Sequence, residues 1–391
     1  MALNTVSSDR LSTNVKNTNF TAAEKQDLTD DILPLAGQLG NRNLIINGAM
    51  NVAQRGTSST SSGYHTVDRF SVEDGGVDEA STKEQAAVTS GGAYDSGFRN
   101  CLKITNGNQT GGAGASDYVQ IMQRIEAQNM ANSGWNYPSS SSFITLSFWV
   151  KSSVAQVYSG SVRTQDGTSY SYKFDTPSIS ADTWTKVTKT IPGNSNLTFA
   201  DDNGHGFDVF IYPFIGTTYT SSNANTETWI TGATNTYAND MTSTWYTTNN
   251  ATFEVTGVQL EVGSVATDFE HRSYAQELSL CERYLQVIAE GSNKYIATSF
   301  AYNSSLAIGV FTFKTQMRTA PSMVQTTGTN YYFLAQANTI HYFTAFEALS
   351  HPGKDQSGIY PLQSAVSVTQ GQAGGISTVD AAAKLMLQAE L

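Results

Sequence analysis

Short apolar runs separated by clusters of Gly, Asn, Ser and Thr recur along this chain from Asn41 onward. Runs of this length, bounded by turn-forming residues, are typical of β-strands, and no internal repeat is present. Only 14% of the 391 residues are charged, so the charge pairs that support surface helices are scarce. The pattern predicts an all-β fold. The strands predicted in its first part are 44–46, 70–72, 101–104, 118–125, 143–150, 154–162, 170–174, 184–191 and 207–215.

One of these runs, 143–150, alternates strictly between apolar and more polar residues. Successive side chains of a strand point to opposite faces of the sheet, so one set should enter the core while the other carries Trp149 to an exposed or groove-lining face. The predicted core set is Ile144, Leu146, Phe148 and Val150, and the opposite set is Thr145, Ser147, Trp149 and Lys151.

A strand followed by a helix is predicted in the segment from Phe253 onward. The strand is interrupted by Gly257, which indicates a β-bulge, and it ends at Gly263. Ser273 and Gln276 have the spacing of a capping box, which predicts a helix from Tyr274 to Ile288. The helix carries one apolar seam at a/d spacing, made of Tyr274, Leu278, Cys281, Leu285 and Ile288. This spacing fits a seam that gathers several chains, and equally a helix lying on its own domain with Leu280, Tyr284 and Val287 as a second apolar face.

Several stretches of this region resemble the tail fibres and related receptor-contact proteins of tailed bacteriophages. At the strand and helix they are TGVQLEVGSVAT (256–267), 269–274 and LSLCERY (278–284). Elsewhere they are NRNLIINGAMNVAQRGT (41–57) with Asp68-Arg69-Phe70, FITLSFWVKSS (143–153), FKTQMRTAPSM (313–323) and Ala389-Glu390-Leu391. The resemblance covers residues 41 to 391. It implies a jelly-roll sandwich like that of carbohydrate-binding modules, a helix that gathers three chains, and a small C-terminal β-domain.

The domain organisation expected from the sequence has four parts. Residues 1–40 form an N-terminal attachment segment with a short helix, 41–272 a jelly-roll domain, 273–290 a linking and trimerisation helix, and 291–391 a small C-terminal β-sandwich that contacts the receptor. The N-terminal helix starts at a capping box of Thr21 and Glu24. Its apolar stripe, predicted to dock on the virion, is Leu28, Ile32 and Leu33.

Charge and cysteine content narrow the possible partners. The net charge is −11 and no Lys/Arg-rich run is present, which argues against nucleic acid and anionic membrane surfaces because phosphate contacts need clustered cations. Cys101 and Cys281 fall in a predicted strand and a predicted helix, so we expect two buried thiols and no disulfide. No signal peptide or membrane span is recognised, so we expect synthesis in the host cytoplasm.

No residue pattern predicts catalysis, a metal or a cofactor. The five histidines lack metal-ligand spacing, and His271 is expected to be structural. The run Asp201-Asp202-Asn203-Gly204 only partly matches a calcium loop, so a β-turn is the expectation. Glu73, Asp74, Asp78 and Glu79 cluster in one loop, where a solvated edge is favoured over a pair of catalytic carboxylates.

Recognition of a sugar remains, because Trp and Tyr pack on the C–H faces of sugar rings while Asn, Asp and Gln bond their hydroxyls. The candidate residues are Trp135, Tyr137, Trp229, Trp245, Tyr331, Tyr332, His341 and Tyr342. The sequence thus predicts a homotrimeric, non-enzymatic tail fibre that attaches to other tail proteins through residues 1–40 and adsorbs to a host surface polysaccharide or lipopolysaccharide. The alternatives are a glycan-processing enzyme or its accessory module, and a head or neck decoration protein without a receptor role.

Overall fold

The computed structural model of the chain describes residues 42–220, 225–233, 236–361 and 367–391. The chain divides into two units, Met1–Asn43 and Leu44–Leu391, and all the strands named below belong to the second. Leu28, Ile32 and Leu33, the predicted attachment residues, lie outside the described part. Every ladder between the named strands is antiparallel, and the described helices are short, so the all-β prediction is confirmed at this level.

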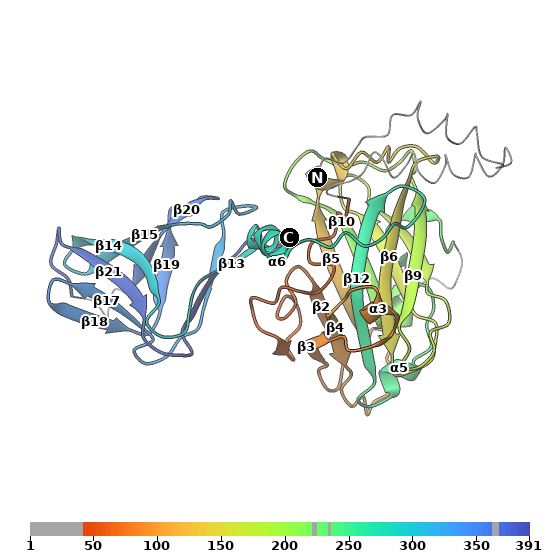
Figure 1. Cartoon of the computed structure of the whole chain (residues 1–391), viewed down its shortest axis with the longest axis horizontal. Coiled ribbons are helices and arrows are strands. Elements are labelled where there is room, and N and C mark those ends of the chain that lie inside the picture. Colours follow the sequence, from red (N-terminus) through yellow and green to blue (C-terminus); the bar gives the residue numbers. More distant parts are fainter. Residues whose placement is uncertain (1–41, 221–224, 234–235, 362–366) are drawn as a thin grey trace, which may run out of the picture. The chain divides into compact units, whose positions relative to one another are not determined.

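Two six-stranded sheets form a β-sandwich (Figure 1). Between them lies a core of buried aliphatic and aromatic side chains. The first sheet contains, in spatial order, β1 (Ser58–Ser59), β3 (Thr82–Ala87), β4 (Asn100–Thr105), β12 (Thr252–Val262), β6 (Phe143–Ser152) and β9 (Thr185–Pro192). The second contains β11 (Trp229–Thr231), β8 (Tyr170–Asp175), β7 (Ser159–Thr164), β10 (His205–Ile215), β5 (Tyr118–Glu126) and β2 (Ser71–Gly75).

The two central strands of the first sheet follow the predicted pattern. In β6, Ile144, Leu146, Phe148 and Val150 are all in the core. Trp149 is half-buried on the opposite face. In β12 the register with β6 shifts between Thr256 and Gln259, and Gly257 has φ +64°, so the predicted bulge is confirmed.

The helix α6 (Tyr274–Glu282) begins at the predicted capping box, in which Ser273 accepts from the backbone N–H of Gln276. It is shorter than predicted, because β13 (Leu285–Glu290) takes up the last residues of the expected helix. Leu285 and Ile288 therefore lie in a strand, and the continuous five-residue seam is wrong. Pairing of β13 with β22 (Lys384–Gln388), nearly a hundred residues later, outweighs the local helical spacing.

The C-terminal region has two sheets. The smaller contains β13, β22 and β16 (Ser322–Gln325). The larger contains, in spatial order, β18 (Thr339–Phe343), β17 (Tyr332–Gln336), β21 (Ala373–Thr378), β14 (Tyr295–Asn303), β15 (Leu306–Thr312), β20 (Gln356–Pro361) and β19 (Phe346–Ser350). The seven-stranded sheet curls around a second core, to which both sheets contribute (Figure 1).

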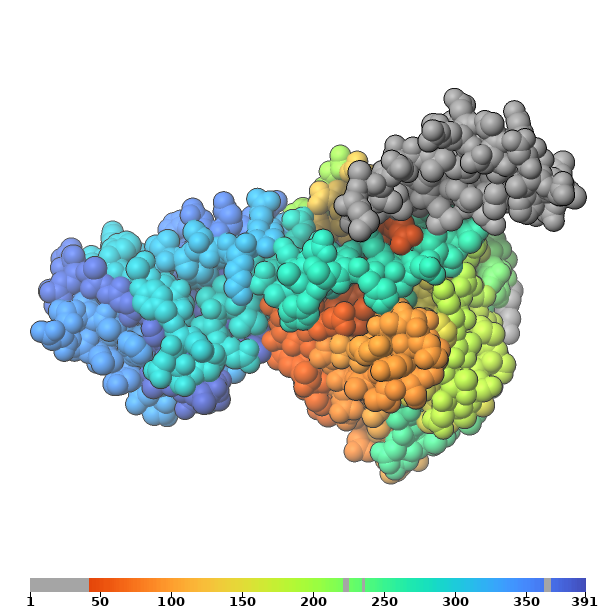
Figure 2. Space-filling model, in the orientation of Figure 1, coloured from red at the N-terminus to blue at the C-terminus, as the bar shows by residue number. Residues whose placement is uncertain are grey.

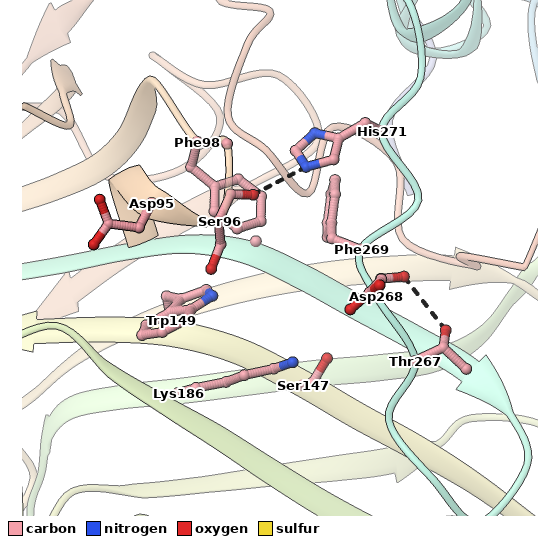
Figure 3. A pocket seen from close by; sticks show the side chains of 12 residues that line it. Asp95, Ser96, Phe98, Ser147, Trp149, Lys186, Thr267, Asp268, Phe269 and His271 are labelled. Atoms are coloured by element: carbon pink, nitrogen blue, oxygen red, sulfur yellow. Dashed lines mark hydrogen bonds between the residues drawn. The ribbon is translucent and has the colours of Figure 1, made fainter. Parts of the chain in front are cut away.

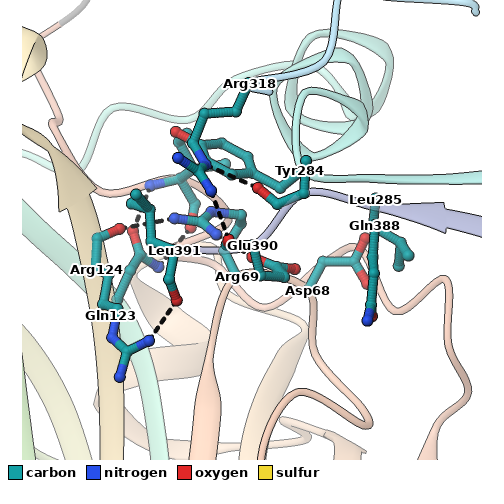
Figure 4. Close-up of polar contacts among 12 residues, drawn as sticks. Asp68, Arg69, Gln123, Arg124, Tyr284, Leu285, Arg318, Gln388, Glu390 and Leu391 are labelled. Carbon is teal, nitrogen blue, oxygen red and sulfur yellow. Dashed lines mark hydrogen bonds and ion pairs between the residues drawn. The ribbon is translucent and has the colours of Figure 1, made fainter. Parts of the chain in front are cut away.

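Residues from four of the separate sequence stretches that carry the family resemblance meet at one polar junction (Figure 4). Arg69 is 1% exposed, pairs with the Glu390 carboxylate and donates to the Arg124 carbonyl at 2.7 Å. Its guanidinium lies 3.4 Å from the centre of the Tyr284 ring. Burial is the largest influence on this guanidinium and would lower its pKa, but Glu390 together with Tyr284 and Tyr64 outweighs burial and raises the pKa of Arg69. A buried charge of this kind ties β13 and the chain end to the sandwich.

One further ion pair and a set of hydrogen bonds to backbone oxygens complete this junction. Glu126 is fully buried and accepts from both Nε and Nη2 of Arg283, at 2.6 and 2.7 Å. Burial would raise the pKa of Glu126, but the hydrogen bonds from Arg283 and Tyr284 more than offset this and lower it. Arg318 donates to the backbone oxygens of Ala389 and Glu390 at 2.8 and 2.7 Å. The motif residues therefore have a structural role at this place.

Both cysteines are free and buried, as predicted, and burial raises the pKa of each thiol. Within the described ranges, no helix is long and apolar enough to cross a membrane.

Candidate functional site

A cavity of about 460 Å³ opens on the outer face of the first sandwich sheet. Its floor comes from β6, β9 and β12, and its walls come from the segment around α3 (Gly91–Asp95) and from the segment that follows β12. In the space-filling view these walls are the orange surface and the teal surface beside it (Figure 2). The cavity is large enough to hold a small ligand group and is open to solvent.

Trp149 and Lys186 lie side by side on the floor of the cavity. They are direct cross-strand partners in the β6–β9 ladder, so their side chains leave the same face of the sheet. Figure 3 shows Lys186 extending past Trp149 toward Ser147. The helix α3 approaches the indole so closely that a Cβ on Gly92 would lie 2.7 Å from it. Glycine at this position therefore lets backbone cover one side of the Trp149 ring.

Phe98, Phe269 and His271 form an aromatic wall above the floor (Figure 3). The centres of the Phe98 and Phe269 rings are 4.9 Å apart in an edge-to-face arrangement, and the centre of the His271 ring is 4.9 Å from that of Phe269. The Nε2 atom of His271 is 3.2 Å from the Ser96 carbonyl oxygen, which assigns the proton to Nε2. The bulge at Gly257 makes this wall possible, because a Cβ there would lie 2.5 Å from the Phe98 ring.

Polar groups of both signs surround the aromatic rings. Asp95 and Asp268 line the cavity together with Lys186, and both carboxylates belong to exposed residues. The segment after β12 that carries Asp268 is fixed by Glu261, whose Oε1 accepts a hydrogen bond from the backbone N–H of Thr267 at 2.9 Å. The cavity thus offers ring faces, hydrogen-bond acceptors and one ammonium group within a single hollow.

A second, smaller cavity of about 200 Å³ lies on the same face, beside Trp184 and Lys151. The Lys151 ammonium lies 5.1 Å from the centre of the Trp184 ring and 2.9 Å from the Glu254 carboxylate. Trp149 and Trp184 both pack against the small outer core that includes Ala93 and Phe98. The two cavities therefore share one aromatic support.

The structure does not bring the eight sugar-contact candidates from the sequence to one site. Trp135, Trp229, Trp245 and Tyr332 are buried in the two cores, where their polar atoms bond to backbone oxygens. Their rings pack on neighbouring side chains and face no cavity described above. Tyr137, Tyr331 and His341 are half-buried, and Tyr342 is exposed on β18.

Glu73 and Asp74, predicted in an acidic loop, lie in β2, and the Asp74 side chain is 4% exposed, so the expected solvated edge is wrong for Asp74. The acidic residues and the calcium-like run take part in local hydrogen bonding. Asp74 accepts from the Lys83 ammonium at 2.7 Å, and Asp78 accepts from the Gly111 N–H at 2.6 Å. Asp202 accepts from the Gly204 N–H at 2.8 Å, as in a turn. No cluster of His, Cys, Asp or Glu with the geometry of a metal site occurs among the described residues.

Sequence reasoning placed Trp149 and Ser147 on the face that carries the cavity, but it counted neither as a sugar contact and missed the rest of the site. Strand alternation placed Trp149 on the outer face, and pairing of β6 with β9 would have added Lys186. Phe98, Phe269 and His271 come from loops, where no periodicity predicts the direction of a side chain. His271, expected to be structural, lines the cavity as well as holding Ser96.

Comparison with known proteins gives only remote similarities. No protein-family model matches the chain, and no curated protein matches it. Among solved structures, the chain is similar to the enzymatically active domain of tailspike protein 4 of bacteriophage CBA120, with 11% identity over 56% of this chain and a TM-score of 0.30. That alignment spans 21% of the tailspike structure.

Two carbohydrate-binding domains are similar over most of their length. The family 11 carbohydrate-binding module of Clostridium thermocellum, in complex with a mixed-linked tetrasaccharide, has 13% identity, covers 54% of this chain and 98% of that chain, and gives a TM-score of 0.24. The N-terminal cellulose-binding domain of β-1,4-glucanase C from Cellulomonas fimi has 11% identity, covers 55% and 99%, and gives 0.25. All these TM-scores are below 0.5, so a proposal about function depends on this chain's own residues.

Proposed function

We propose that this chain is a non-enzymatic glycan-recognition protein whose sugar site is the cavity around Trp149. The observation that carries the proposal is the half-buried Trp149 ring on the floor of an open cavity that also contains Asp95, Asp268 and Lys186. A sugar needs an apolar platform for its C–H face and polar groups for its hydroxyls, and this cavity supplies both.

The aromatic and the charged residues of the cavity have different roles in the proposed binding. The Trp149 indole packs against one sugar ring, while Phe269 and His271 limit the ring's position from the side. The Asp95 and Asp268 carboxylates accept hydrogen bonds from hydroxyls, and Lys186 donates to a hydroxyl or to an acidic group of the sugar. Because Gly92 and the Gly257 bulge fix the aromatic rings before a ligand arrives, little side-chain entropy is lost on binding.

The biological setting we propose is the tail of a bacteriophage. The motif resemblance described above supports a homotrimeric tail fibre that attaches to other tail proteins through residues 1–40 and adsorbs to a host polysaccharide or lipopolysaccharide. Its location would be the virion, after synthesis in the host cytoplasm. A head or neck decoration protein remains the alternative, which predicts no affinity for host cells.

The test is binding of the full chain to a panel of purified lipopolysaccharide O-chains and capsular polysaccharides, measured by calorimetry. Replacing Trp149 with Ala should weaken binding about thirtyfold, corresponding to ~2 kcal/mol for an anchoring aromatic residue. Tyr274→Ala, which removes an exposed aromatic ring on α6, is the matched control and should bind like the wild type. Equal binding by wild type and Trp149→Ala would overturn the proposed site.

A glycan-processing enzyme is the second candidate, because Asp95 and Asp268 line one cavity and glycosidases use two carboxylates. The same panel, incubated with the wild type and assayed for new reducing ends, separates the two. Release of reducing ends that is lost in both Asp95→Asn and Asp268→Asn would favour the enzyme. Binding without release would favour recognition alone.

A further inference from the structure

The outer face of the seven-stranded sheet is apolar and exposed. Six large hydrophobic residues of β14, β15 and β18 stand out from it with between 46 and 62% of their surface exposed. They are Tyr295, Phe300, Tyr302, Val310, Ile340 and Tyr342. We call this surface, together with its cross-strand neighbours Phe333 and Ile308, the apolar face.

Cross-strand register shows that the apolar face is continuous. Directly paired residues of neighbouring strands point to the same side of a sheet. One row of such pairs runs across six strands, through Ile340, Ala335, Gly375, Thr298, Val310 and Gly358. The next residues to either side include Phe333 paired with Tyr342, and Phe300 paired with Ile308. Gly375 leaves room for the Tyr295 ring, since a Cβ there would lie 3.0 Å from that ring.

None of these paired positions has a charged side chain. The face also differs from the cavity around Trp149, because its rings lie mainly among Val, Ile, Ala and Gly, and its polar groups are uncharged hydroxyls such as those of Thr298 and Ser377. A charged partner would gain nothing from it, and a glycan would leave most of its hydroxyls unbonded. An equally uncharged apolar protein surface is the chemistry that fits.

The size of the apolar face suits an interface. An aromatic side chain contributes roughly 150–250 Å² when buried, so six large side chains about half exposed present on the order of 500 Å² of apolar surface. That is near the upper limit for the largest apolar patch of a typical monomer, and it is more than half of the ~800 Å² that each partner gives to a standard interface. Every copy of the chain carries this same face, so a matching surface is present at the concentration of the chain itself.

We propose that the apolar face is the surface through which copies of this chain associate with one another. Two such faces are mutually complementary in their lack of charge, and their contact removes the exposed rings from water. The inference is independent of the sugar site and does not need the helix seam that the structure interrupts at Leu285.

The test is sedimentation equilibrium of the full chain, with Phe300→Glu and Ile340→Glu as two separate variants at the middle and edge of the apolar face. Each places a charge where the partner's face would bury it, so the dissociation constant should rise at least about tenfold. Val265→Glu makes the same change at an exposed valine outside the apolar face and should leave the association unchanged. Circular dichroism and thermal melts select the variants that fold.

Association of the wild type that is weakened in a folded face variant, and kept in Val265→Glu, supports the inference. A wild-type chain that remains a monomer at tens of micromolar overturns it, as does association that neither face variant weakens. If the face variants stay monomeric like the wild type but lose binding to the polysaccharides, the apolar face is a glycan platform and the inference fails.

Discussion

The outer faces of two sheets, one in the sandwich and one in the C-terminal region, use aromatic residues in different ways. On the sandwich sheet, Trp149 and Trp184 are half-buried, lie beside cavities and have lysines and carboxylates next to them. On the seven-stranded sheet, Tyr302 and Phe300 stand free of any charge among aliphatic residues. Under the two proposals, the same residue class serves two kinds of ligand, and the polar neighbours rather than the rings decide which one fits.

The position of the exposed apolar residues changes where copies of the chain would associate. A helix seam at residues 274 to 288 would have put the joining surface next to the sandwich. Because Leu285 and Ile288 belong to β13, most of the large exposed hydrophobic residues in the described part of the chain are on the seven-stranded sheet. Under the two proposals, sugar binding and assembly use separate surfaces, and single substitutions should affect one without the other.

The largest effect is expected at the junction on which both surfaces depend. Arg69→Ala leaves the Glu390 carboxylate without its main partner and removes the cation from the Tyr284 ring, so unfolding should become easier by about 3–5 kcal/mol in urea titrations. Arg99→Ala, which removes an exposed guanidinium from over Tyr94, should cost about 1 kcal/mol or less. Equal costs for the two would mean that the junction is not a single buried network.

The helix and the strand that follows it should respond differently to the same substitution. Leu285 is 1% exposed in β13, so Leu285→Asp should destabilise the fold by about 3 kcal/mol or more, because it buries a carboxylate. Leu278 is only partly buried on α6, so Leu278→Asp should change the free energy of unfolding by about 1 kcal/mol or less. The mass of the protein in solution should stay the same. Dissociation caused by Leu278→Asp would show that copies of the chain associate through α6, and the proposed role of the apolar face would then be wrong.

Much of the sandwich could be predicted, because strand alternation and β-bulges depend on residues that are neighbours in the sequence. Alternation in 143–150 gave the correct core side of β6, and a lone glycine in a strand marked the bulge of β12. The end of α6 could not be predicted, since residues 285 to 290 form a strand that pairs with β22 far along the chain. Local spacing does not contain that information.

The site was harder to predict than the fold. Trp149 and Ser147 lie on a strand whose alternation fixes their direction, while Phe98, Phe269 and His271 reach the cavity from loops. Tryptophan content is a poor guide to the site, because Trp135, Trp229 and Trp245 fill the core with their N–H groups bonded to backbone oxygens. Exposure, which separates these residues from Trp149, is not readable from a single sequence.

A change of pH should act on the junction between the two regions. Burial raises the pKa of Asp68 to about 6, from an ordinary value of 3.8. A raised pKa in the folded state means that the folded protein favours protonated Asp68. The stability that protonated Asp68 contributes is present below about pH 4, and on the order of 2 kcal/mol of it is lost as the pH rises through about 6. The stability contributed by Glu126 depends on pH in the opposite direction, because the pKa of Glu126 is lowered in the folded protein. That stability is lost as the pH falls below the ordinary titration range of a glutamate.

Urea titrations from pH 4 to pH 7 check this, with Asp68→Asn as the variant. Asn keeps an acceptor for Gln54 but cannot ionise, so the stability of wild type relative to the variant should decline as the pH rises through 6. A difference that stays constant over this range would show that Asp68 does not titrate there.

The glycine at the bulge should distinguish the sandwich face from the apolar face. Gly257→Ala adds a Cβ 2.5 Å from the Phe98 ring at φ +64°, so it should cost about 1–3 kcal/mol and weaken glycan binding by displacing the aromatic wall. Gly112→Ala has a comparable φ of +80° with no atom near the new Cβ, and it isolates the backbone cost. Self-association should be the same in both variants, and a loss of association in Gly257→Ala alone would indicate that the two faces are coupled.

The smallest effect concerns charge, which is present on one face and absent from the other. Lys186 is exposed, so Lys186→Met should weaken the binding of an acidic polysaccharide only about two- to fivefold, and less in high salt because mobile ions screen the ammonium. Lys294→Met, in the C-terminal region, should bind like the wild type. Raising sodium chloride from about 0.05 to 0.5 M should leave self-association through the apolar face undiminished, since that contact has no charge to screen. Association that weakens in parallel with sugar binding would mean that an ionic contact holds the copies together, and the distinction between the two faces would be lost.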